Sequence, residues 1–101
     1  MDLNKLMKQA QQMQAGLAAK QAQLATQTVE ATVGGGKVHV VANCAGDVLS
    51  IKIDPSVIDP ADAEFLEEII LKGVQEAIAT GKEKAAAEMK KLTGGLNLPG
   101  L

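Results

Sequence analysis

The 101-residue chain contains no arginine, tryptophan or tyrosine, and it has one phenylalanine, one histidine and one cysteine. A single cysteine excludes an internal disulfide and any metal site built from several thiolates. Without arginine the chain has no bidentate reader of guanine, and without an aromatic platform it cannot stack single-stranded bases. Because Phe65 is the only aromatic residue, the core must consist of smaller aliphatic side chains. Strong contact with a nucleic acid is therefore left to lysine.

An apolar run of about 18 residues, as a membrane span requires, is also missing, and the first residues show no signal-peptide pattern. We therefore expect a soluble, cytoplasmic protein. The length is typical of one domain, so we assign residues 1–101 to a single domain. We expect its tail, residues 96–101, to be mobile.

The spacing of apolar residues predicts one helix followed by three strands. In residues 2–27 they recur at alternating spacings of three and four, which is typical of a long helix. The period changes to two in residues 28–33, 37–43 and 47–53, and turn-forming segments at 34–36 and 44–46 separate these strands. We expect an antiparallel meander with one apolar face, on which the third strand places Leu49, Ile51 and Ile53 inward.

A second long helix is predicted to begin at Asp59 and Pro60. These residue types favour the N-cap and the first helical position, and an apolar stripe at helical spacing follows them. Thr80 and Gly81 predict a kink or a break in this helix. The complete order defines an α+β fold of the α-β-β-β-α type, with a three-stranded sheet flanked by long terminal helices.

The lengths of these elements indicate a dimer. A helix of about 25 residues spans about 37 Å, whereas strands of six or seven residues cover about 20–23 Å. Both helices must therefore overhang the sheet, and the overhanging part of the first helix has apolar residues that its own sheet cannot cover. Two valines beside the second turn add an apolar patch on the outer sheet face. The candidate dimer-interface residues are Leu3, Leu6, Met7, Met13, Val41 and Val48.

No group of residues forms a recognisable catalytic or metal site. His39 lies in the middle of a predicted strand, and Glu64, Glu67 and Glu68 lie at a helix start, where carboxylates complement the helix dipole. The glycines at 34–36 lack the spacing of a phosphate-binding loop and lead into a strand. We expect no enzymatic activity, no catalytic residues, no metal, no cofactor and no small-molecule substrate.

Charge is sorted along the chain, although the net charge is −2. Residues 1–27 have three lysines against one aspartate, and residues 81–101 have four lysines against two glutamates, so each end carries +2. Residues 28–80 have three lysines against nine acidic residues, which gives −6. The terminal lysines are candidates for sequence-independent, salt-sensitive contacts with DNA phosphates, or they only solvate two long helices. They are Lys5, Lys8, Lys20, Lys82, Lys84, Lys90 and Lys91.

Several stretches carry a resemblance to a known family. They are LMKQAQQMQ at 6–14, the glycines 34–36 followed by VHV at 38–40, VLSIKIDP at 48–55, Asp59 with Pro60, and MKKLTGGL at 89–96. Together they resemble the YbaB/EbfC family of bacterial nucleoid-associated proteins over essentially the whole chain, although residues 44–46 depart from its glycine-rich turn. The resemblance implies a tweezer-like homodimer with helical arms that binds duplex DNA at the bacterial nucleoid, often with weak sequence preference. It carries over no catalytic residue and no individual DNA contact.

We therefore expect a dimeric, non-enzymatic DNA-binding protein. Its partners would be duplex DNA and a second copy of the chain, without a membrane. The rival interpretation is a protein-interaction scaffold, in which the apolar seam of the first helix and the helical arms hold a partner protein. A steep salt dependence of DNA binding favours the first, and a stoichiometric protein partner that survives nuclease treatment favours the second.

Overall fold

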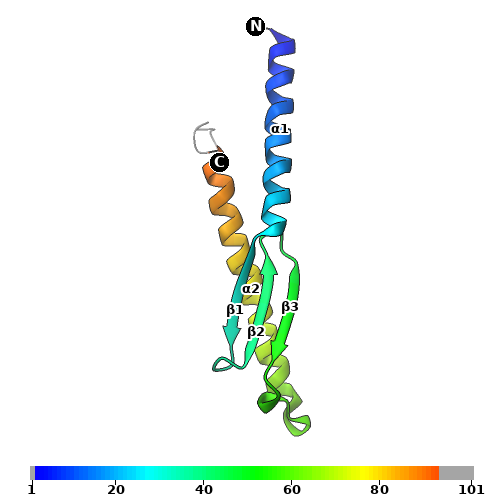
Figure 1. Ribbon diagram of the computed structural model, residues 1–101, viewed down its shortest axis with the longest axis vertical. Helices are drawn as coiled ribbons and strands as arrows, with labels where there is room; N and C mark the ends of the chain where they lie inside the picture. The colour runs from blue at the N-terminus through cyan, green and yellow to red at the C-terminus, as the bar shows by residue number, and fades with distance from the viewer. Residues whose placement is uncertain (1, 94–101) are drawn as a thin grey trace.

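The elements follow the predicted order in the computed structural model, which describes residues 2–93 (Figure 1). Helix α1 (Leu3–Thr26) is followed by strands β1 (Thr28–Val33), β2 (Val38–Asn43) and β3 (Val48–Ile53), and then by helix α2 (Ala63–Thr93). Two short 3-10 turns, Pro55–Val57 and Pro60–Asp62, connect β3 to α2. The predicted α-β-β-β-α arrangement is confirmed. The tail 96–101, predicted to be mobile, lies outside the described residues.

Local side-chain chemistry sets the ends of these elements. Asp2 caps α1, because its carboxylate accepts a hydrogen bond from the backbone N–H of Asn4 at 3.1 Å. The β1–β2 turn uses three glycines with φ of 64°, 66° and 88°, a region that other residues rarely adopt. Asp59 accepts from the backbone N–H of Ala61 at 2.9 Å, but it begins a 3-10 turn, and α2 starts at Ala63. Within residues 2–93 no helix combines the length and the apolar character that crossing a bilayer requires.

The core lies between α2 and two of the three strands. The sheet has the order β1-β2-β3 with both pairs antiparallel, and α2 runs along one of its faces (Figure 1). The inward residues of β2 are completely buried, as the alternating pattern predicts. The buried cluster consists of Ala31, Val33, Val38, Val40, Ala42 and Ala77.

Strand β3 is left largely uncovered, and this corrects the prediction that its apolar residues are buried inward. Leu49 is 54% exposed and Ile51 is 41% exposed, while Ile53 packs partly against the core. One helix is about 10 Å wide, so it covers about two strands spaced about 4.8 Å apart. A β-bulge between Val41 and Ala42 also shifts the β2–β3 register and leaves Leu49 without an opposite residue. Strand β3 is therefore an exposed apolar edge.

Helix α2 continues through residues 80–81, so the predicted break is wrong. A Cβ atom at Gly81 would lie 2.8 Å from the backbone oxygen of Asn43, and one at Gly73 would lie 2.9 Å from Cγ2 of Val40. Glycine at these two positions allows α2 to approach the sheet closely. Gly81 thus serves packing and does not end the helix.

We expect Gly81→Ala to lower the free energy of unfolding by about 1–3 kcal/mol, because the added methyl overlaps a backbone atom of β2. Gly16→Ala is the matched control, since a Cβ there meets nothing within 4 Å. Alanine at position 16 should raise stability by about 1 kcal/mol through its helix propensity. Urea unfolding at a fixed protein concentration measures both changes, and equal effects at the two positions would contradict the packing role of Gly81.

Candidate nucleic-acid interface

The two long helices extend beyond the same end of the sheet and form two arms (Figure 1). We call residues 3–20 of α1 and residues 82–93 of α2 the arms. The molecule measures 71 × 22 × 17 Å, and the side chains of residues 2–15 are all exposed. The overhang that helix and strand lengths predict is therefore present in the protein.

The predicted DNA-contacting lysines all lie on these arms, and six of the seven are exposed. Two residues seven apart on a helix share a face, as Lys84 and Lys91 do, whereas Lys82 and Lys90 point in other directions. The fold brings the lysines to one end of the molecule but does not gather them into one strip. The exposed ones are Lys5, Lys8, Lys82, Lys84, Lys90 and Lys91.

The opposite end of the molecule is acidic. Residues 54–68 carry six carboxylates and no lysine, and they form the β3–α2 connection and the start of α2, far from the arms (Figure 1). The backbone N–H of Ser56 donates to Asp54 Oδ1 at 2.8 Å and lowers the pKa of Asp54. Charge that is sorted along the sequence is thus separated along the long axis of the protein.

Lys20 differs from the other arm lysines because it is largely shielded from water and pairs with an acid of the other arm. Its Nζ donates to Oε2 of Glu88 at 2.8 Å, and the two side chains are only 19% and 23% exposed. The other carboxylate oxygen of Glu88 lies 3.7 Å from Nζ of Lys91. The hydrogen bond from Lys20, and then its charge, lower the pKa of Glu88. No local sequence pattern points to this pair, since its members are 68 residues apart.

We expect Glu88→Gln to destabilise the protein at neutral pH but not in acid. The fold holds the pKa of Glu88 below its ordinary value of 4.5. The contribution of the pair is therefore present above that pH and is lost as the pH falls through the folded-state pKa. Thermal unfolding of both proteins between pH 7 and about pH 3 tests this. A difference in Tm that persists undiminished in acid would contradict it.

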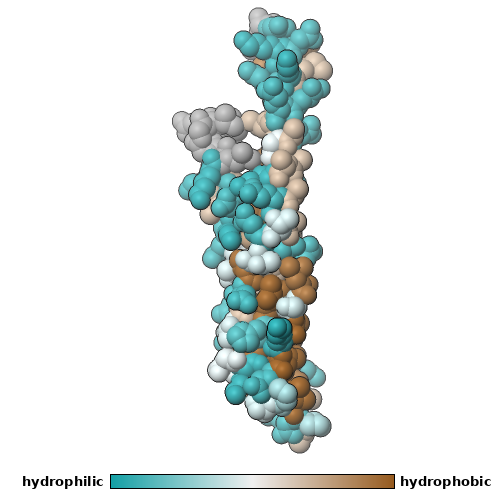
Figure 2. Space-filling model, in the orientation of Figure 1, coloured by the Kyte–Doolittle hydropathy of each residue, from teal (hydrophilic) through white to brown (hydrophobic). Residues whose placement is uncertain are grey.

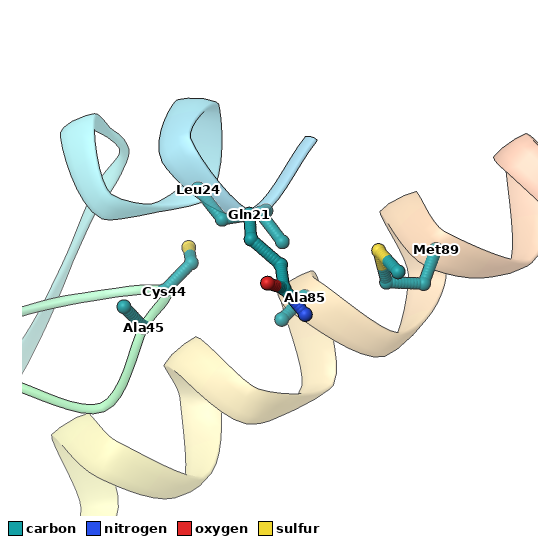
Figure 3. Close-up of a pocket in the computed structure, with 6 residues that line it drawn as sticks. All are labelled: Gln21, Leu24, Cys44, Ala45, Ala85 and Met89. Carbon is teal, nitrogen blue, oxygen red and sulfur yellow. The ribbon is translucent and has the colours of Figure 1, made fainter. Parts of the chain in front are cut away.

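A hollow of about 420 Å³ lies where the arms leave the sheet (Figure 3). Gln21 reaches across it from α1 toward Ala85 of α2. Its lining offers one thiol and one amide among apolar groups, and no cluster of three or more potential metal-ligating side chains occurs within residues 2–93. The hollow separates α1 from α2 at the point where the two arms begin. Its lining residues are Gln21, Leu24, Cys44, Ala45, Ala85 and Met89.

The candidate dimer residues fall into two separate groups. Val48, 38% exposed, lies on the edge strand β3 opposite the buried Ala42, whereas Val41 is half-buried on β2 and faces the other side of the sheet. The predicted patch of these two valines on the outer face is therefore not formed. The sequence analysis did not name Leu49 and Ile51 as interface candidates. The signal for them was that one helix is too narrow to cover three strands, so an edge strand must stay exposed. We call Val48, Leu49 and Ile51 together the β3 surface. Figure 2 shows hydrophobic residues running along the side of the body where β3 lies. The other group lies on the α1 arm, 42–69% exposed, and comprises Leu3, Leu6, Met7 and Met13.

Comparison with known proteins agrees with this architecture. A nucleoid-associated protein of Akkermansia muciniphila is 61% identical over 99 residues, covering 98% of this chain and 95% of that protein. A nucleoid-associated protein of Thermoanaerobacter sp. (strain X514) is 49% identical over 100 residues, covering 99% and 90%. The crystal structure of an uncharacterized protein from Helicobacter pylori shares the fold, with a TM-score of 0.70 at 21% identity, covering 95% of this chain and 97% of that one. Because the profile of the YbaB/EbfC DNA-binding family matches residues 1–96, this chain belongs to that family.

Proposed function

We propose that this protein binds duplex DNA at the nucleoid as a homodimer, through contacts of its arm lysines with phosphates and with little readout of sequence. The observation that carries the proposal is the charge separation, with six exposed lysines on the arms and six carboxylates at the other end. Membership of a DNA-binding family and the names of the relatives support DNA as the polyanion. Phosphate contacts position a protein on DNA without reading its sequence, and the absence of arginine favours that mode.

The β3 surface supports the homodimer. The edge of strand β3 has backbone N–H and C=O groups without a strand partner, and its apolar side chains are open to water. Both features favour contact with another chain. A second copy covering Val48, Leu49 and Ile51 would bury the side chains that α2 leaves open. It would also combine four arms in one particle, which matters because each terminal segment alone carries a charge of only +2.

A DNA titration at several salt concentrations tests the proposed binding mode. With about six phosphates neutralised by the dimer, the affinity should fall about a thousandfold between ~50 and ~200 mM salt. Duplexes of unrelated sequence should bind with similar affinity. A flat salt response, or no binding to any duplex at low salt, would overturn the proposal. That result would favour the arms as a protein-binding surface.

Ile51→Lys is expected to convert the dimer into monomers, because it places a charge within the β3 surface. Thr32→Lys is the matched control, since Thr32 is exposed on β1, which forms the opposite edge of the sheet. Sedimentation equilibrium should give the 10.5 kDa mass of one chain for Ile51→Lys and twice that for the control. A dimeric Ile51→Lys protein would place the interface elsewhere.

A further inference from the structure

Helix α1 is attached to the body of the protein near its C-terminal end. Leu24 is buried there, and the backbone N–H of Cys44 donates to the carbonyl oxygens of Leu24 and Gln27 at 3.2 and 3.0 Å. The side-chain Nδ2 of Asn43 donates to the carbonyl oxygen of Ala25 at 3.2 Å. Residues 24–27 therefore form a pivot from which the rest of α1 projects.

Beyond this pivot the hollow of about 420 Å³ separates α1 from α2 (Figure 3). The ion pair between Lys20 and Glu88 spans the gap between the helices at an Nζ–Oε2 distance of 2.8 Å. Both side chains are about four-fifths shielded from water, and an ion pair is stronger there than on an open surface. The pair thus forms a strut between the two arms, placed one helical turn beyond the pivot.

The position of this strut gives it leverage over the tip of α1. Lys20 lies four residues from Leu24, about 6 Å along the helix, whereas Leu3 lies 21 residues away, about 32 Å. If α1 moves as a rigid rod about Leu24, a displacement at Lys20 is about five times larger at the tip. If loss of the ion pair let Lys20 move by about 1 Å, the tip of α1 would therefore move by about 5 Å.

We propose that Glu88 is a positioning residue that holds α1 through Lys20 and thereby sets the spacing between the two arms. The inference rests on the proposed function, because it takes the arms as the elements that contact DNA. A fixed spacing presents the exposed lysines in one geometry and reduces the ordering that binding would otherwise require. Glu88 would contribute to binding without contacting DNA itself.

The spacing can be measured as the distance between spin labels on the two arms, at Gln9→Cys and Ala86→Cys, by double electron–electron resonance. Both positions are exposed, and Cys44, at 5% exposure, is shielded from the label. Dilution with an excess of unlabelled chain restricts the signal to distances within one chain. The otherwise unchanged protein should give one narrow distribution. Gln9 lies about 22 Å along α1 from Leu24, so Glu88→Gln should shift or broaden the distribution by about 4 Å.

Two further variants separate positioning from a general effect of the substitution. The exchange Lys20→Glu with Glu88→Lys should restore the narrow distribution, because it re-forms the pair with reversed charges. Glu83→Gln removes an exposed carboxylate from the same helix and should leave the distribution unchanged. An unchanged distance in Glu88→Gln, or an exchange variant as broad as Glu88→Gln, would overturn the inference.

Addition of a duplex at low salt distinguishes this inference from the proposed function. Bound DNA should leave the distance in the parent protein unchanged and should narrow the distribution of Glu88→Gln. A shift of about 4 Å or more in the parent protein on DNA binding would overturn the fixed spacing. A parent protein that binds no duplex would overturn the proposed function, while the distances without DNA still decide the role of Glu88.

Discussion

Replacement of Lys84 and Lys90 by glutamate is expected to weaken DNA binding about a hundredfold at low salt, to a similar extent for every duplex sequence. Both lysines are exposed on the α2 arm, and a dimer would present each of them twice. Loss of about four phosphate contacts should reduce the slope of log affinity against log salt by about 3 to 4. The measurement is a fluorescence-anisotropy titration with two unrelated duplexes at three salt concentrations.

The matched control is the double variant Lys52→Glu and Lys72→Glu. It makes the same change in net charge at two exposed lysines of the body, outside both arms. Its effect should be much smaller, because phosphates bound by the arms lie far from these positions on the scale of the ~10 Å Debye length. If the control weakened binding as much as the arm variant, net charge rather than the arms would account for affinity. A loss confined to one duplex sequence would indicate base readout.

Asn43→Ala is expected to lower the free energy of unfolding by about 3 kcal/mol, the largest loss for a single side chain outside the apolar core. Asn43 is 4% exposed, and its Oδ1 accepts from the backbone N–H groups of Ala45 and Asp47 at 3.0 and 2.9 Å. Its Nδ2 donates to the carbonyl oxygen of Ala25 and to Asp47 Oδ2, both at 3.2 Å. Alanine would remove the four hydrogen bonds through which the buried Asn43 side chain joins the β2–β3 turn to the C-terminal end of α1.

Asn4→Ala makes the same chemical change at an exposed position of α1 and should alter stability by less than about 0.5 kcal/mol. Urea unfolding at one protein concentration compares the two variants, since a dimer makes stability depend on concentration. A loss below about 1 kcal/mol for Asn43→Ala would mean that water replaces these hydrogen bonds and that the turn does not depend on them.

The local architecture could be predicted from sequence because it follows local rules. Period-two alternation placed Val38, Val40 and Ala42 on the buried face, and strands expected at 28–33 and 47–53 occur at Thr28–Val33 and Val48–Ile53. The errors concern contacts between elements. Within one helix, Thr80 followed by Gly81 indicates a break. Whether β2 lies so close that only glycine fits at position 81 depends on how α2 packs on the sheet. The exposure of β3 likewise depends on where that helix lies.

The same distinction applies to the candidate interface. Charge sorting predicted which segments carry the lysines, and the fold brings both segments to one end. It could not predict that Lys20 is paired, because the register of α1 against α2 is set by contacts at Leu24 and Cys44. The alternating pattern likewise could not mark Leu49 and Ile51 as exposed interface candidates, because their exposure follows from the bulge and from the limited width of α2.

The acidic end gives this protein an electrical polarity along its length of 71 Å. If the arms bind DNA as proposed, such a dipole would turn the lysines toward the phosphates and the carboxylates toward solvent as the protein approaches a duplex. Because charges are screened over about 10 Å at 0.1 M salt, the distant carboxylates would hardly oppose binding by the arms, and a net charge of −2 would be no obstacle. A duplex coated with this protein would present an outer layer of carboxylates, and we expect such coated duplexes to repel one another rather than to be bridged.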